Sequence, residues 1–226
     1  MDNLFGDLRF GARRRARGGA FQAAAEYTGR WGWSVAVGSG QGSPDGVCGC
    51  AATRCAAPGL HSAVDPAAAV GPGAGFGPQA PELRELWAVE APVLLPAGRS
   101  FDVLDVPAQP GLQALVRLER MGTQVGPVLA LPTGRLLFFV AAGTAQRLPE
   151  LLYRMGWDDA ALDLACHGEG SFVAAPPTVL GGLGPVRWLR RPSRDSAGCP
   201  PEARLLLGTL AYACHRSRER SAELAS

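Results

Sequence analysis

Leu131-Pro-Thr-Gly-Arg-Leu-Leu-Phe-Phe139 is the stretch around which the rest of the chain is organised. Its Pro-Thr-Gly segment predicts a turn over residues 132–135, because proline and glycine are typical turn residues. The apolar runs on either side predict strands at residues 125–130 and 136–140. The stretch therefore predicts a strand–turn–strand unit in the middle of the chain.

On both sides of this unit the sequence predicts strands interleaved with helices. Apolar runs predict strands at residues 33–37, 92–95, 101–106, 161–166, 171–175 and 186–189, and helices at 19–30, 81–87, 110–121, 148–155 and 200–215. The helix at 110–121 is expected to bury a stripe consisting of Leu112, Leu115, Leu118 and Met121. Strands interleaved with helices predict an α+β fold in which mixed or antiparallel sheets pack against helices.

Composition narrows the function classes. With 226 residues, 47% of them hydrophobic, the chain suits one domain with short extensions. No apolar run approaches the ~20 residues that span a bilayer, and the N-terminal residues contain no apolar secretion segment. We therefore expect a cytoplasmic protein without a membrane partner. All 22 basic residues are arginine, so a phosphate-binding loop of the Gly-Lys type and Schiff-base chemistry, which both need lysine, are excluded. The net charge is only +2, so any nucleic-acid binding must use a local group of basic side chains.

The expected domain organisation is a main domain with an extension at each end. Residues 1–19 form an arginine-rich arm, read either as a solvated disordered tail or as a phosphate-contacting segment. Residues 20–192 form the main domain, within which residues 66–81 are a connector rich in glycine and proline. Residues 193–226 are a C-terminal helix and tail.

A cysteine and histidine loop lies at residues 48–61. Cys48, Cys50, Cys55 and His61 place three thiols and one imidazole within fourteen residues, a familiar tetrahedral set for structural Zn²⁺. The single residue between Cys48 and Cys50 is tighter than the usual spacing, so an unmetallated reduced loop is the alternative.

Several motifs occur in an order that resembles a known family. They are Gly32-Trp-Ser-Val35, the cysteine loop ending in Pro58-Gly-Leu-His61, the acid-bearing strand at 101–106, the Pro-Thr-Gly turn before an aromatic strand, and Val173-Ala-Ala-Pro-Pro-Thr178 followed by Arg187-Trp188. Together they resemble the N-terminal primase–polymerase domain of bifunctional DNA primase/polymerases, over about residues 21–192. The resemblance implies an RRM-like catalytic core.

The resemblance also implies a catalytic site, from which this chain departs. Such enzymes look like nucleotidyltransferases that hold two Mg²⁺ or Mn²⁺ ions on an Asp-x-Asp pair and a third Asp, with a histidine for nucleotide phosphate. Here the pair reads Asp105-Val-Pro107, and the histidine position reads Leu136. Asp105 and Asp163 remain as catalytic acids. Arg135 and Arg187 are the candidate nucleotide or nucleic-acid contacts.

Two other acids are candidate replacements for the missing carboxylate. Asp102 lies three residues before Asp105, which places it on the opposite face of a strand, and Glu169 lies in a later loop. Loss of electrostatic stabilisation costs ~10²–10³ in rate for each lost donor, so a catalytically degenerate, stand-alone protein that binds DNA or nucleotides is the favoured reading. The alternatives are an active metal-dependent primase/polymerase and a regulatory scaffold that binds a protein partner.

Overall fold

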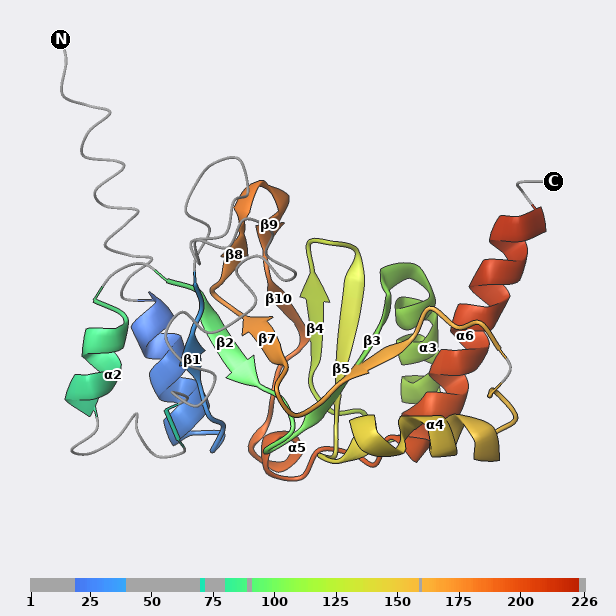
Figure 1. The fold of residues 1–226 in the computed structure, drawn as a ribbon, viewed down its shortest axis with the longest axis horizontal. Coiled ribbons are helices and arrows are strands. Elements are labelled where there is room, and N and C mark those ends of the chain that lie inside the picture. Colours follow the sequence, from blue (N-terminus) through green and yellow to red (C-terminus); the bar gives the residue numbers. More distant parts are fainter. Residues whose placement is uncertain (1–18, 40–69, 72–79, 89–90, 159, 224–226) are drawn as a thin grey trace, which may run out of the picture. The chain divides into compact units, whose positions relative to one another are not determined.

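The computed structural model describes residues 19–39, 70–71, 80–88, 91–158 and 160–223 (Figure 1). The cysteine and histidine loop, nearly all of the N-terminal arm and most of the 66–81 connector lie outside these residues. The chain divides into two compact units, one made of residues 1–96 and 172–187 and the other of residues 97–171 and 188–226. Of the expected site residues, Asp105, Arg135 and Asp163 belong to the second unit, whereas Arg187 is the last residue of the first.

The first unit contains a small antiparallel sheet. Its strands are β1 (Ala36–Val37), β2 (Val93–Pro96) and β7 (Phe172–Ala175), in the order β1-β2-β7. A helix over residues 19–29, α2 (Ala80–Leu86), and a turn formed by β8 (Val179–Leu180), η1 (Gly181–Leu183) and β9 (Gly184–Pro185) complete the unit. Tyr27 in the first helix donates a hydrogen bond of 2.7 Å from its hydroxyl to the carbonyl oxygen of Pro176. The strand expected at 33–37 is shorter in the structure, where β1 has two residues.

The second unit has a β-α-β-β-α-β topology. Its elements in chain order are β3 (Asp102–Pro107), α3 (Ala108–Arg120), β4 (Val128–Leu131), β5 (Arg135–Val140), α4 (Thr144–Arg154), β6 (Ala165–His167), β10 (Arg187–Arg190), α5 (Arg194–Gly198) and α6 (Arg204–Glu223). The sheet order is β10-β4-β5-β3-β6, and β5 pairs antiparallel with both β3 and β4. Without β10 this is the split β-α-β arrangement, which confirms the expected α+β fold and RRM-like core.

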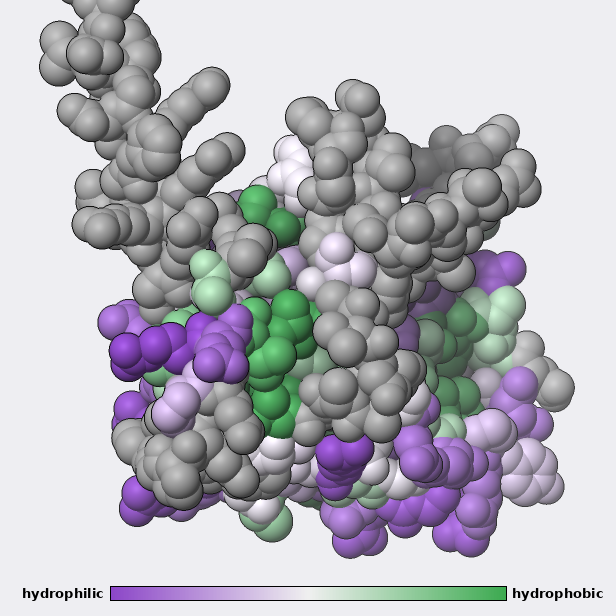
Figure 2. Space-filling model, turned by 60° about the vertical axis from the view of Figure 1, so that its left-hand side comes forward, coloured by the Kyte–Doolittle hydropathy of each residue, from purple (hydrophilic) through white to green (hydrophobic). Residues whose placement is uncertain are grey.

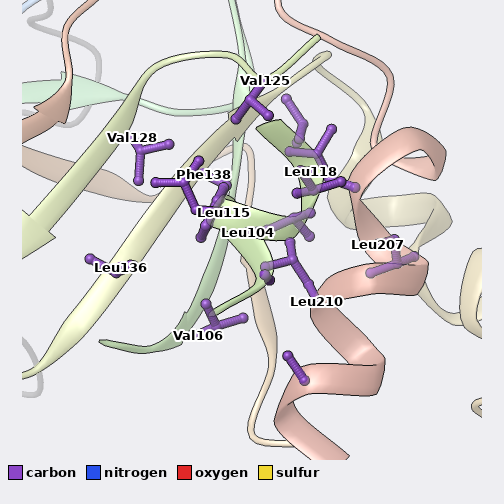
Figure 3. Close-up of a cluster of buried hydrophobic side chains, with 14 of the residues drawn as sticks. Leu104, Val106, Leu115, Leu118, Val125, Val128, Leu136, Phe138, Leu207 and Leu210 are labelled. Carbon is purple, nitrogen blue, oxygen red and sulfur yellow. The ribbon is translucent and has the colours of Figure 1, made fainter. Parts of the chain in front are cut away.

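One face of this sheet packs against helices (Figure 3). Alternate side chains of β3 and β5, among them Leu104 and Phe138, are buried in one cluster with residues of α3 and α6, including Leu118 and Leu207. Because successive side chains of a strand point to opposite faces, the odd-numbered residues of β3 and β5 point away from these helices. The second face is the one that carries the candidate site.

The buried face of α3 differs from the expected stripe. Leu115 and Leu118 are buried as expected, but Leu112 and Met121 are exposed, and their places are taken by Gly111 and Ala114. A Cβ atom on Gly111 would lie 3.0 Å from side-chain atoms of Leu136 and Val106. The small residues therefore let α3 approach the sheet closely, a requirement that helical periodicity alone does not reveal.

Two further boundaries were wrong. The expected strand at 161–166 is formed only from Ala165 to His167, so Asp163 lies in the bend before β6 rather than on a strand. The expected helix at 148–155 begins earlier, at Thr144. The carboxylate of Asp102 accepts a hydrogen bond of 2.7 Å from the backbone nitrogen of Ala145, which satisfies one of the unpaired donors at this helix start.

The described surface is mixed in character. In the view of Figure 2, hydrophobic residues come to the surface between hydrophilic ones, and hydrophilic residues dominate the lower edge. The exposed large hydrophobic side chains are spread over several elements: Leu86, Leu112, Val116, Met121, Tyr153, Val179, Leu183, Leu189, Leu205 and Tyr212. Among the helices that the structure describes, none is long and apolar enough to cross a membrane.

Candidate functional site

The candidate site begins with one acid and one base on neighbouring strands. Asp105 lies on β3 and Arg135 begins β5, where it pairs with Pro107 in the antiparallel register. Both positions are odd-numbered, so their side chains project from the sheet face opposite the helices. Arg135 Nε donates a hydrogen bond of 2.7 Å to Asp105 Oδ1, and its Nη2 donates to the backbone oxygen of Asp105 at 3.3 Å.

The same guanidinium also holds the second expected acid. Arg135 Nη1 donates a hydrogen bond of 2.7 Å to Oδ1 of Asp163, which reaches the site from the bend before β6. The Asp105 side chain is partly buried, with 15% of its surface exposed, whereas the Asp163 side chain is 67% exposed. Arg135 therefore bridges the two carboxylates, one sheltered and one in solvent.

His167 is a site residue that the sequence analysis did not identify. It lies on β6, beside Val103 in the register, and its Nε2 is 2.8 Å from Asp105 Oδ2. An ionised carboxylate only accepts hydrogen bonds, so a neutral His167 ring donates from Nε2. Both oxygens of Asp105 consequently have partners, Arg135 on one side and His167 on the other. The spacing along the chain held no signal for this contact, because it depends on the pairing of β3 with β6.

The electrostatics favour a fixed cation between the acids. Burial alone would lower the pKa of the Arg135 guanidinium, but its hydrogen bonds to Asp163 and Asp105, together with their negative charges, outweigh burial and raise that pKa. With a neutral His167, two carboxylates and one guanidinium leave the cluster with a net charge of −1 (−2 + 1). Much of the charge that would attract a divalent ion is therefore already compensated.

The other residues considered for catalysis lie away from Asp105 or have no carboxylate. Leu136, aligned with the family's histidine, is buried on the helix-facing side of β5, and Pro107 occupies the position of the second Asp. Asp102 is fully buried on the face opposite Asp105, where it contacts the start of α4, so it does not join the site. Glu169 is exposed in the turn before β7. None of these side chains supplies the missing carboxylate next to Asp105.

These residues do not fit a two-ion site. Two divalent ions flanking a phosphate need several carboxylate oxygens, whereas the oxygens of Asp105 are bonded to Arg135 and His167. No group of three or more His, Cys, Asp or Glu side chains is arranged to hold a metal ion within the described ranges. The proposed zinc ligands, Cys48, Cys50, Cys55 and His61, lie outside those ranges.

Two remaining residues bear on the chemistry. Arg187, the other predicted nucleotide contact, begins β10 with an exposed side chain. Cys166 lies next to His167 but is packed against the helix-side core. Burial, with a contribution from the charge of Asp102, raises the pKa of the Cys166 thiol to about 12, so it stays protonated at neutral pH and is a poor nucleophile. A thiol–imidazole dyad is therefore not formed here.

Comparison with known proteins identifies the family. No curated protein and no solved structure matched the chain. The family model described as bifunctional DNA primase/polymerase, N-terminal, matches residues 24–202, which include all four residues of the cluster. With this range covering well over half of its 226 residues, the chain belongs to the bifunctional DNA primase/polymerase N-terminal domain family.

Proposed function

We propose that this protein is a nucleotide- or nucleic-acid-binding member of its family that has lost metal-dependent nucleotidyl transfer. The observation that carries the proposal is the guanidinium of Arg135, hydrogen-bonded at 2.7 Å to both Asp105 and Asp163. A fixed organic cation between these acids takes the place that a divalent ion requires. It supplies charge but no open coordination position for a phosphate oxygen.

The loss of the second Asp supports the same conclusion. On β3, residues 105 and 107 share one face, and the second of them is proline, which has no ligand atom in its side chain. A divalent ion would have to displace Arg135 and then rely on two acids from different elements. The proposal therefore predicts weak binding of Mn²⁺ and no nucleotide incorporation.

Binding of nucleotides or DNA is the part of the family's function that needs no resident ion. Phosphate groups are recognised by arginine through paired, charge-assisted hydrogen bonds, and Arg135 and Arg187 remain the candidate contacts on the sheet. Cys48, Cys50, Cys55 and His61 are proposed as ligands of a structural zinc ion, which native mass spectrometry of the purified protein would detect. Metal-free protein would contradict the zinc proposal and leave the rest intact.

The deciding experiment measures primer extension and de novo primer synthesis with Mg²⁺ and with Mn²⁺. The Asp105→Ala/Asp163→Ala variant serves as the blank, with its folding checked by circular dichroism. We expect the wild-type protein to show no incorporation above this blank. Incorporation that depends on metal and exceeds the blank would establish an active polymerase and overturn the proposal.

A second measurement tests the role of Arg135 directly. Binding of Mn²⁺ is followed by calorimetry in the wild-type protein, in Arg135→Gln and in Pro107→Asp/Arg135→Gln. We expect affinity to rise in the first variant, because removal of the guanidinium frees the carboxylates of Asp105 and Asp163. It should rise further in the second variant, which adds a third carboxylate at residue 107. Arg147→Gln removes the same charge from an exposed position on α4 and should leave Mn²⁺ affinity unchanged. Equal affinities in all four proteins would refute the idea that Arg135 excludes the ion.

Salt dependence separates nucleic-acid binding from the alternative of a protein-binding scaffold. Each phosphate contact releases counterions, so affinity for single-stranded DNA should rise steeply as salt is lowered. The measurement is fluorescence anisotropy of a labelled oligonucleotide between low and physiological salt. A flat curve without binding at low salt would favour the scaffold.

A further inference from the structure

A hollow between α3 and α6 lies on the helical side of the second unit. Its volume is about 230 Å³, and the residues that line it are Gln113, Ala114, Arg117, Thr209, Tyr212, Ala213, Arg216 and Arg220. These residues come from two helices that pack against each other. The sheet face with Asp105 points away from these helices, so the hollow is distinct from the candidate site already described.

Two of the lining residues are small and buried. Ala114 on α3 and Ala213 on α6 are buried, and both belong to the lining. The longer lining side chains, among them Arg117, Arg216 and Arg220, are exposed and form the rim.

The rim is strongly basic. Three arginines line the hollow, and none of the described residues that line it is acidic. Glu219 lies nearby and bonds Arg216 at 3.1 Å, which leaves a local charge of +2 (3 − 1). The other two arginines are held by polar or aromatic neighbours: Arg220 Nη2 donates to Gln113 Oε1 at 3.3 Å, and the Arg117 guanidinium lies 5.7 Å from the centre of the Tyr212 ring.

We propose that this hollow binds a mononucleotide, with its phosphate among Arg117, Arg216 and Arg220. Guanidinium groups donate paired hydrogen bonds that match phosphate oxygens. Thr209 offers a hydroxyl to the sugar, and the exposed Tyr212 ring offers an aromatic edge to the base. The volume is below the ~300–1,000 Å³ of pockets that enclose drug-sized ligands, so the hollow would hold the phosphate and part of one nucleotide and leave the rest in solvent.

The experiment titrates dAMP into the full-length protein by calorimetry at low salt. Deoxyadenosine and inorganic pyrophosphate are titrated in parallel, to separate the contributions of base and phosphate. The test variant is Arg117→Gln/Arg220→Gln, and the control is Arg120→Gln/Arg204→Gln, which removes the same two charges from the same helices outside the hollow. Arg135→Gln is titrated as well, because Arg135 is a candidate nucleotide contact on the sheet face and does not line the hollow, so this variant separates binding at the two sites.

We expect dAMP to bind more tightly than either fragment. The test variant should weaken its binding by about tenfold or more, since charge-assisted hydrogen bonds to the phosphate are lost. The control should bind as the wild-type protein does, and Arg135→Gln should keep the dAMP binding that the test variant loses. If the test variant proves unfolded by circular dichroism, Arg216→Gln alone is the substitute and should weaken dAMP binding in the same direction.

Three results would overturn the proposal. The first is binding of dAMP that is unchanged in the test variant. The second is loss of binding in Arg135→Gln, which would place the nucleotide on the sheet face. The third is an oligonucleotide that binds through these arginines while dAMP does not, which would assign the hollow to a nucleic-acid strand.

Discussion

The two ion pairs of Arg135 should differ in energy although their lengths are equal. Both N–O distances are 2.7 Å, but the Asp105 side chain is 15% exposed and that of Asp163 is 67% exposed, while Arg135 itself is 25% exposed. Two unit charges at this separation attract by about 6 kcal/mol at an effective dielectric constant of about 20, before the costs of desolvation and ordering. The net value depends mainly on how well water screens each pair.

The expected coupling energies follow from this exposure. A hydrogen bond to a sheltered charged group contributes about 1.5–3 kcal/mol to stability, which is the expected coupling between Arg135 and Asp105. A pair with an exposed partner contributes about 0.2–1 kcal/mol, which is the expected coupling with Asp163. For a chain of this size, each 1 kcal/mol corresponds to a shift in Tm of about 2–4 °C.

Two double-mutant cycles measure these energies. One uses Arg135→Gln and Asp105→Asn, the other Arg135→Gln and Asp163→Asn, with urea unfolding followed by tryptophan fluorescence at pH 7. The cycles are repeated in 1 M salt, where the screening length falls to about 3 Å and the Asp163 coupling should vanish while most of the Asp105 coupling persists. Couplings that are equal, or a larger one for Asp163, would refute the argument that burial decides the strength of these bridges.

Three further outcomes test the packing and the thiols. Leu118→Ala should cost about 2–5 kcal/mol in urea unfolding, while Leu112→Ala, on the exposed side of α3, should cost less than about 1 kcal/mol; equal losses would contradict the observed helix face. Gly98→Ala should lower Tm by several degrees in a thermal melt, because φ is +87° and a Cβ would lie 2.4 Å from the backbone of residue 169; an unchanged Tm would be inconsistent with this contact. Iodoacetamide at pH 8 should alkylate the exposed Cys199 much faster than Cys166, as measured by peptide mass spectrometry; rapid labelling of Cys166 in folded protein would argue against its burial. Burial raises the pKa of Cys166 in the folded protein to about 12, so its contribution to stability should be present at neutral pH and should decline above pH 9, where the thiol of the unfolded chain ionises.

Much of the fold was accessible from local patterns. The apolar runs located β3, β5 and α3 to within a few residues, because a strand and a helix repeat their buried side chains with different periods. The same rule placed Asp102 and Asp105 on opposite faces of β3, as the structure confirms. It failed at the short strand β6, where three residues are too few to show a period and Asp163 was placed on a strand.

The candidate site was accessible only in part. The acids at 105 and 163 and the proline at 107 were found by their order along the chain. Arg135 was predicted as a nucleotide or nucleic-acid contact, which stays a prediction, and its bonds to both acids were not foreseen. His167 was not identified as a site residue. Its contact with Asp105 joins residues 62 positions apart, and no local pattern encodes such a separation.

The amino-acid sequence by itself determined the α+β class, the order of the elements, the family and the absence of a second acid at residue 107. These properties depend on residue identity and on periods of two or 3.6 residues, which act within a few positions. Only the tertiary structure decided that Arg135 closes the space between two acids and that three arginines from α3 and α6 line one hollow. Those features arise where strands and helices from distant parts of the chain are packed together, and the pairing register and the helix contact set which side chains meet.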